Sequence, residues 1–418
     1  GHTRWATHGV PSESNAHPHQ KGDVIGVHNG IIENFREIKA ELESKGYQFT
    51  SETDTEVVVQ LCASYLDLGY TIEKAFESTL SRLEGAFALC FMFKVNTDKL
   101  LIARRGAPLV VGYGNSAVFV GSDAVSLSHL IDDVIFLEED DWAIVESKSL
   151  NIFNKSGVIT NREKKRIERD FGEIGKGNYQ HFMLKEINEQ SEVLSYATAS
   201  FIDHKSSRVE MLQGLNEIKS ISRLILIACG TAYYACAVAK YWFEKYAKIP
   251  VEIDVASEFR YRDSPLEDKD LVILVSQSGE TADTLAALRK VKGKVKKIIS
   301  IINVMESSIA RESDFVLPIK AGPEIGVAST KAFTSQLAVM ASVVIYFASN
   351  RQILSKKEIS ELIDALMSAP RLIADVLAKE EEFKNFALKL EHATSALFLG
   401  RGSLYPLALE AAFKLKEI

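Results

Sequence analysis

The second half of the chain alternates short apolar segments with helical patterns, and this alternation constrains the fold more than any other feature. Apolar segments at 224–227, 271–275 and 298–302 are followed by helical patterns at 235–245, 282–292 and 307–312. Strands that alternate with helices form a parallel sheet with helices on both faces. The sequence therefore predicts an α/β domain that begins near Ser222.

The first 160 residues have a different pattern, in which short strands are joined by turns. We expect strands at 24–27, 86–93, 117–120 and 142–145, and helices at 34–45 and 55–67. This order predicts an α+β layer fold. The run from Thr53 to Glu56 precedes an apolar segment and is typical of a helix N-cap, so Asp54 already has a structural explanation.

The domain organisation follows from these two patterns. Residues 155–222 are polar with helical spacing, as in a connector, and the first boundary is predicted near Gly172. Residues 396–405 resemble residues 225–234, since each reads as a strand, a glycine with serine or threonine, and a helix, which predicts a second like-folded domain. We expect a first domain at 1–171, a linker at 172–222, an α/β domain at 223–352, and linking helices with the start of a second copy at 353–418.

Composition excludes several classes of protein. A chain of 418 residues is too long for one hydrophobic core, and a net charge of −7 leaves no broad cationic face, so we expect no nucleic-acid partner. The basic run at 164–169 is interrupted by Glu163 and Glu168 and is interpreted as a solvated face. The four cysteines have no C-x-x-C spacing, and we expect a cytoplasmic protein with reduced thiols, no membrane span and no metal or cofactor. Both ends are expected to be truncated, because the chain begins without methionine and stops inside a helical pattern.

A candidate phosphate site follows the strand at 271–275. Ser276, Ser278 and Thr281 supply hydroxyl groups around Gly279, and a helix begins directly afterwards. The unpaired N–H groups at a helix start carry partial positive charge and bind anions. No Walker-type lysine motif and no G-x-G-x-x-G is present, so a sugar monophosphate fits better than a nucleotide. A helix capped by serine is the structural alternative.

Three segments then resemble one known family. Together, 276–281, 229–231 and 327–333 are similar to the first sugar-isomerase (SIS) domain of the glutamine:fructose-6-phosphate aminotransferases, the glucosamine-6-phosphate synthase family. The resemblance implies a sugar-phosphate site formed by Thr231, Ser276, Gln277, Ser278, Thr281, Val327 and Ser329. The family often has serine where this chain has Ala232, so one hydroxyl donor is missing; a neutral hydrogen bond contributes only about 0.5 to 1.5 kcal/mol.

The first 30 residues hold five of the nine histidines. His17 and His19 are a possible metal-ligand pair without grouped carboxylates, and structural histidines are the simpler interpretation. The motifs around 4–9 and 28–30 instead resemble the glutaminase domain of class II amidotransferases, which have the N-terminal-nucleophile hydrolase fold. The resemblance implies a glutamine site formed by Arg4, Trp5, Thr7, His8 and Asp54, and an oxyanion hole formed by Asn29 and Gly30.

The last helical pattern places Glu410, Lys414 and Glu417 on one face. A surface ladder of ion pairs is the structural interpretation. The resemblance implies a catalytic set in which Glu417 moves a proton between two sugar carbons and Lys414 and Glu410 lie beside it.

The resemblance also implies an activity and its limits. It implies transfer of the glutamine amide nitrogen to fructose-6-phosphate and isomerisation to glucosamine-6-phosphate, the first step of hexosamine synthesis, in a homodimer or larger homo-oligomer. The family's nucleophilic cysteine precedes Gly1, and its ring-opening histidine and Schiff-base lysine follow Ile418, so we expect residues 1–418 alone to be inactive. A non-catalytic sugar-phosphate-binding regulator is the alternative.

Overall fold

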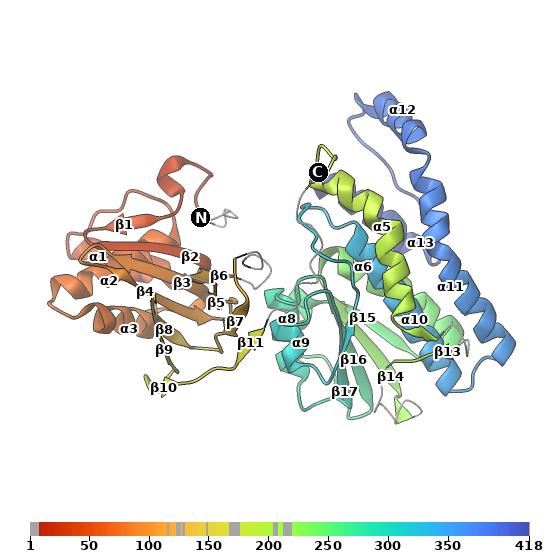
Figure 1. Cartoon of the computed structure of the whole chain (residues 1–418), viewed down its shortest axis with the longest axis horizontal. Coiled ribbons are helices and arrows are strands. Elements are labelled where there is room, and N and C mark those ends of the chain that lie inside the picture. Colours follow the sequence, from red (N-terminus) through yellow and green to blue (C-terminus); the bar gives the residue numbers. More distant parts are fainter. Residues whose placement is uncertain are drawn as a thin grey trace. The chain divides into compact units, whose positions relative to one another are not determined.

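The computed structural model describes residues 8–114, 117–122, 127, 130–147, 149–166, 176–203, 208–211 and 220–417. The chain forms two compact units, Gly1–Asp170 and Phe171–Ile418 (Figure 1).

Unit 1 contains two antiparallel sheets. The larger sheet has the order β1-β2-β3-β4-β8-β9-β10, and the smaller has the order β11-β7-β5-β6. The strands of the larger sheet are His19–Lys21, Val24–Ile32, Gly85–Phe93, Asn96–Arg105, Trp142–Glu146, Leu150–Phe153 and Ile159–Thr160, in that order. Those of the smaller sheet are Lys164–Arg166, Asp133–Phe136, Val110–Tyr113 and Val118–Gly121.

Three helices cover one face of the larger sheet: α1 (Phe35–Ser44), α2 (Asp54–Asp67) and α3 (Ile72–Arg82). The opposite face packs on the smaller sheet through a second apolar cluster. Unit 1 is therefore a helix, sheet, sheet arrangement, which agrees with the predicted α+β layer fold. The sequence analysis did not predict α3, although Thr71 caps it by accepting a hydrogen bond from the Lys74 N–H and it buries Phe76. A short 3-10 helix, Glu13–Asn15, precedes β1.

Unit 2 is built on a parallel sheet with the order β15-β14-β16-β17-β18. In that order the strands are Val251–Val255, Arg223–Ala228, Asp270–Ser276, Lys297–Ile302 and Phe315–Pro318. The three strands predicted from their apolar runs are the central ones, β14, β16 and β17. The two edge strands were not predicted, because β15 alternates apolar with acidic residues and β18 is a run of only four residues that ends in proline.

Helices cover both faces of this sheet, as predicted. One face packs on α6 (Gly230–Trp242), α10 (Lys331–Asn350) and α5 (Phe182–Ala199), and the other on α7 (Ala256–Phe259), α8 (Ala282–Val291) and α9 (Ser308–Glu312). A π-helical turn, Phe243–Ala247, continues α6, and β12 (Ile202–Asp203) pairs with β13 (Arg208–Val209). Although α5 lies in the range expected to be a polar connector, its Val193, Leu194 and Ala197 are buried in the core.

Among the described helices, α10 alone has the length and composition to cross a membrane, with a mean hydropathy of 1.5. Of its most apolar window, 67% is buried inside unit 2. The apolar side chains of α10 therefore belong to the core that covers the parallel sheet.

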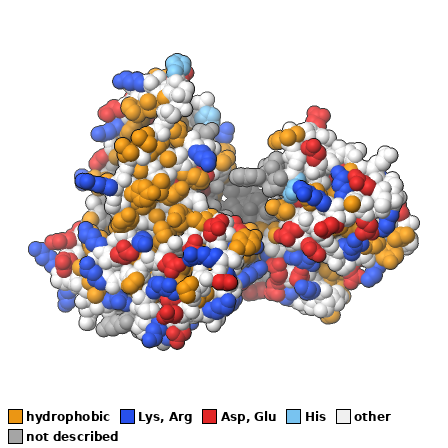
Figure 2. Space-filling view, turned by 180° about the vertical axis from the view of Figure 1, so that it is seen from behind, with side chains coloured by type: hydrophobic (Ala, Val, Ile, Leu, Met, Phe, Trp, Pro, Cys, Tyr) orange, Lys and Arg blue, Asp and Glu red, His pale blue; other side chains and the backbone are white. Residues whose placement is uncertain are grey.

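The last part of unit 2 contains α11 (Lys356–Leu377), α12 (Glu380–Leu390) and α13 (Leu404–Glu417). Residues 396–399, expected to be the first strand of a second domain, are not a strand, and Leu397 and Leu399 are 83% and 82% exposed. The reason is that no described strand pairs with this segment. Figure 2 shows hydrophobic side chains gathered on the surface of the part that holds α11 and α12. Val376 of α11 and Phe383 and Phe386 of α12 are exposed.

Candidate functional site

The turn between β16 and α8 is folded by its own hydroxyl groups. The Ser276 and Thr281 hydroxyl oxygens are 3.0 Å apart, and Ser276 Oγ accepts a hydrogen bond from the Gly279 N–H. Ser278 Oγ accepts one from the Glu280 N–H at 3.2 Å. Thr281 is the N-cap residue of α8, yet its side chain makes no hydrogen bond to the first turn. These side chains therefore shape the loop and do not cap α8, unlike the alternative of a serine-capped helix.

Gly279 is required where this turn approaches α9. Its φ angle is +66°, and a Cβ atom there would lie 2.0 Å from the Ser307 hydroxyl oxygen. The Gly279 carbonyl accepts a hydrogen bond from the Ile309 N–H at 3.1 Å. Any side chain at this position would displace the turn from the helix that supports it.

Asn303, at the end of β17, connects this turn to the segment after β18. Its N–H donates to the Gln277 carbonyl, and its side chain both donates to the Gly322 carbonyl at 2.6 Å and accepts from the Ala321 N–H at 2.9 Å. The sequence analysis missed this residue. Its position directly after a buried apolar strand was the available signal, because the carboxyl ends of parallel strands share one edge of the sheet.

The segment 324–330, which we call the sugar loop, precedes α10. Glu324 accepts hydrogen bonds from the Ser329 hydroxyl at 2.9 Å and from the Thr330 and Ala332 N–H groups at 2.7 and 3.2 Å, so its carboxylate serves the start of α10. Val327 is 84% exposed at the middle of the loop. The two predicted sugar-contact residues, Val327 and Ser329, are thus held in one short loop fixed at its end.

The helix α13 brings its charged residues to the start of α6. Thr231 donates a hydrogen bond to Glu410 Oε1 at 3.0 Å, and Lys414 Nζ lies 3.4 Å from Glu410 Oε1 and 2.7 Å from Glu417 Oε2. Burial raises the pKa of Glu410 above its usual value, even though Lys414 and Thr231 act in the opposite direction. Glu410 is only 5% exposed, so the alternative of a solvated ion-pair ladder does not describe it.

In unit 1, Asp54 opens α2 and is buried. Its Oδ2 accepts a hydrogen bond from the Ile32 N–H at 2.9 Å, and the Nδ1 atoms of His8 and His28 each lie 3.9 Å from that oxygen. The helix cap is Thr53, whose hydroxyl accepts from the Glu56 N–H. Asp54 therefore has no capping role, and its carboxylate faces two imidazole rings.

The predicted oxyanion-hole residues Asn29 and Gly30 lie on β2 and are exposed. Gly30 has a φ angle of +130°, and a Cβ atom there would lie 2.1 Å from the Ala86 carbonyl oxygen of β3. This position therefore admits only glycine. Arg4, Trp5 and Thr7, predicted for the same site, lie outside the described residues.

Three of the early histidines lie within hydrogen-bonding distance of threonine hydroxyls. His17 Nε2 and His28 Nδ1 lie 3.1 and 3.0 Å from Thr55 Oγ1, and His19 Nε2 lies 3.0 Å from Thr53 Oγ1. Within the described part of the chain, no group of three or more His, Cys, Asp or Glu side chains is arranged to hold a metal ion. His17, His19 and His28 thus contact the two threonines at the start of α2.

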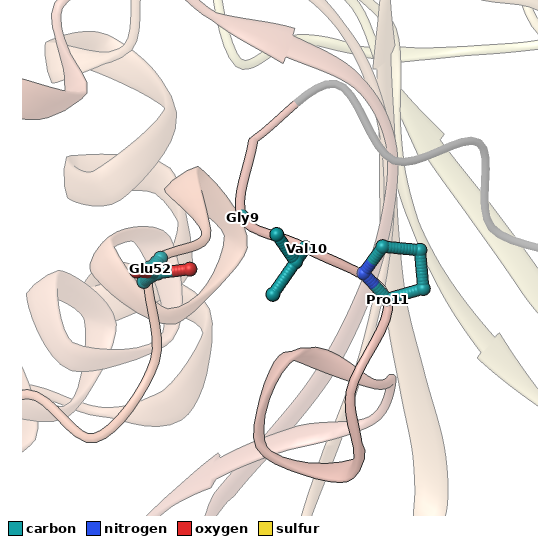
Figure 3. A pocket seen from close by; sticks show the side chains of 4 residues that line it. All are labelled: Gly9, Val10, Pro11 and Glu52. Carbon is teal, nitrogen blue, oxygen red and sulfur yellow. The ribbon is translucent and has the colours of Figure 1, made fainter.

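A surface pocket lies beside the first described residues of the chain. Gly9, Val10, Pro11 and Glu52 line it, and Glu52 faces the other three across the opening (Figure 3). The neighbouring Asn15 donates to the Val10 carbonyl at 2.9 Å and fixes this segment. None of the four lining residues was predicted for a site.

Comparison with known families matches both units. The family described as a glutamine amidotransferase domain matches residues 2–129, and the SIS domain matches residues 217–346. The chain is 51% identical to a glutamine–fructose-6-phosphate aminotransferase [isomerizing] of Bradyrhizobium diazoefficiens and 50% identical to one of Mesorhizobium japonicum. In both cases all of this chain is covered, and it spans 69% of the relative.

A solved structure is also similar. The C-terminal domain of glucosamine-fructose-6-phosphate aminotransferase from Francisella tularensis matches with a TM-score of 0.57 and 40% sequence identity. The match covers 58% of this chain and 69% of that one. The likeness thus extends to a solved fold as well as to sequence.

Proposed function

We propose, since this chain belongs to the family of glutamine–fructose-6-phosphate aminotransferases [isomerizing], that it transfers the amide nitrogen of L-glutamine to fructose-6-phosphate and isomerises the product to glucosamine-6-phosphate. The reaction is the first step of hexosamine synthesis. The observation that carries this proposal is the combination, in one chain, of an amidotransferase unit with an SIS unit whose β16–α8 turn suits a phosphate. A glutaminase alone would not need the second unit, and a sugar-phosphate sensor would not need the first.

In unit 2, the phosphate binds at the turn 276–281, where Ser276, Gln277, Ser278 and Thr281 surround the start of α8. Thr231 lies nearby, and the sugar hydroxyls contact Val327 and Ser329. Glu417 moves the proton between carbon 1 and carbon 2, with Lys414 and Glu410 beside it. Support comes from the Lys414 ammonium, which lies 2.7 Å from Glu417 Oε2 and places a cation directly beside the proposed base.

In unit 1, Arg4 pairs with the α-carboxylate of glutamine and Asp54 with its α-ammonium. Trp5, Thr7 and His8 line this pocket, and Asn29 and Gly30 stabilise the oxyanion. The burial of Asp54 supports its role, because a buried carboxylate interacts more strongly with a cation than an exposed one.

We also propose that the protein is cytoplasmic and forms a homodimer or a larger homo-oligomer. The domain limits 1–171, 172–222, 223–352 and 353–418 are proposed with it.

The test is an assay of the protein expressed from the complete gene. Glutamine and fructose-6-phosphate are supplied together, and glucosamine-6-phosphate and glutamate are measured by chromatography. We expect both products in equal amounts. Binding of fructose-6-phosphate without formation of glucosamine-6-phosphate would contradict the proposal and favour a regulator.

A further inference from the structure

The sugar loop is fastened at its centre by Glu186, a residue of α5 far away in the sequence. Glu186 Oε1 accepts hydrogen bonds from the Ile325 N–H at 2.5 Å and from the Gly326 N–H at 3.0 Å, and its Oε2 lies 3.2 Å from the Gly326 nitrogen. The two N–H groups precede Val327 directly. A single carboxylate thus sets the path of the backbone into the exposed part of the loop.

This carboxylate is buried, and loop N–H groups are its partners. Glu186 is 2% exposed, and among the described residues no lysine, arginine or histidine forms an ion pair with it. A buried charge without a counterion is costly unless several hydrogen bonds stabilise it. The charge on Glu186 therefore holds the loop against α5 more firmly than a neutral acceptor would.

The close approach of Glu186 to the loop also depends on the absence of a side chain at Gly326. A Cβ atom on Gly326 would lie 2.6 Å from Glu186 Oε2, whereas its next neighbours, in Met183, would be at an ordinary 3.4 Å. A side chain at position 326 would therefore displace the Glu186 carboxylate from its hydrogen bonds to the loop. Alanine there is a specific steric probe of the Glu186 contact.

An ion pair anchors the other end of the loop to the same helix. Lys331 Nζ, at the start of α10, lies 2.7 Å from Glu189 Oε2, and Lys331 is 4% exposed. Glu186 and Glu189 are three residues apart and share one face of α5. The loop thus rests on α5 at two points that flank Val327 and Ser329.

We propose that Glu186 is a positioning residue for sugar recognition, which acts through the backbone of residues 325 and 326 to place Val327 and Ser329 against the sugar hydroxyls. This inference rests on the proposed function, because it assumes that the loop contacts the sugar. Glu186 itself touches no substrate. The phosphate turn is held by separate hydrogen bonds, from the Ile309 and Asn303 N–H groups, and none of these involves Glu186.

The test separates recognition of the sugar from recognition of the phosphate. Binding of fructose-6-phosphate to the whole chain is measured by calorimetry, and inorganic phosphate is measured as a competitor. We expect Glu186→Ala and Gly326→Ala each to weaken fructose-6-phosphate binding by about three- to tenfold, as loss of a hydrogen bond implies. Inorganic phosphate should compete as it does in the wild type. Glu192→Gln is the matched control, because this exposed residue of α5 pairs only with Tyr196 among the described residues.

A double variant tests the link between the two residues. In the Glu186→Ala background the clash at position 326 is removed, so adding Gly326→Ala should have less than half of its single effect on affinity. Additive effects, or equal losses for inorganic phosphate and fructose-6-phosphate, would overturn the inference. If the wild type binds no sugar phosphate at all, the proposed function itself has failed, which is a separate and recognisable outcome.

Discussion

At the scale of single residues, Glu417 should be required for isomerisation of the sugar phosphate and not for hydrolysis of glutamine. Glu417→Gln keeps the shape of the side chain and its contact with Lys414, but the amide cannot accept a proton from the sugar. In the protein from the complete gene, we expect sugar-phosphate isomerisation to fall by about 10²- to 10⁴-fold, as loss of a general base implies. Glutamine hydrolysis should stay near the wild-type rate.

The reciprocal substitution, Asp54→Asn, is the matched control for this experiment. It removes the proposed partner of the glutamine ammonium and leaves the sugar site untouched. The variant should bind glutamine more weakly, which raises the KM for glutamine hydrolysis, while the rate of sugar-phosphate isomerisation stays near that of the wild type. Near-normal isomerisation in the Glu417→Gln protein would show that Glu417 is part of an ion-pair ladder only.

At the scale of elements, α2 is stabilised at its start by a buried carboxylate. Burial raises the pKa of Glu56, but hydrogen bonds from Ser51, Thr50 and Gln60 outweigh that effect, and the pKa lies below its usual value of 4.5. A carboxyl group whose pKa is lower in the folded state than in the unfolded state stabilises the protein above the unfolded value. This stabilisation is lost as the pH falls through the folded value.

We therefore expect Glu56→Gln to lower the free energy of unfolding by about 1 to 3 kcal/mol at pH 7, because buried N–H groups lose a charged acceptor. The difference from the wild type should shrink as the pH falls below 4.5. Urea unfolding monitored by circular dichroism between pH 3 and pH 7 measures both effects. Glu37→Gln, on α1, is the control, because no hydrogen bond or ion pair joins its side chain to the described residues. A difference that is constant with pH would contradict the role of charge.

At the scale of the whole molecule, the two units should respond to different ligands. A ligand that binds only the folded state adds about 2.7 kcal/mol of stability at 100 times its Kd. In differential scanning calorimetry of the chain, fructose-6-phosphate should raise the Tm of the transition that reports unit 2 and leave unit 1 unchanged. The double variant Ser278→Ala with Thr281→Ala should lose most of this shift. If the Tm of that variant rose as much as that of the wild type, the assignment of the phosphate site to the β16–α8 turn would be wrong.

The sequence alone was sufficient for features that depend on local pattern. The apolar runs at 224–227, 271–275 and 298–302 predicted three buried parallel strands, because such strands need apolar side chains on both faces. The serine-rich turn was recognisable for a similar reason, since its hydroxyls and glycine are contiguous in the chain. The family resemblance rested on the same contiguous motifs, and comparison with relatives confirms it.

Tertiary structure decided whatever depends on partners distant in sequence. Glu186 was not predicted, because its hydrogen-bond partners are the N–H groups of residues 325 and 326, far away in the sequence. Asn303 was not predicted, because it joins two loops that only the sheet brings together. Residues 396–399 have the pattern of a strand and yet form none here, since a strand requires a neighbour for its N–H and C=O groups. The spacing of Glu410 and Lys414 by itself favoured a surface ladder; burial against Thr231 shows that Glu410 is not solvated, and its catalytic role stays a prediction.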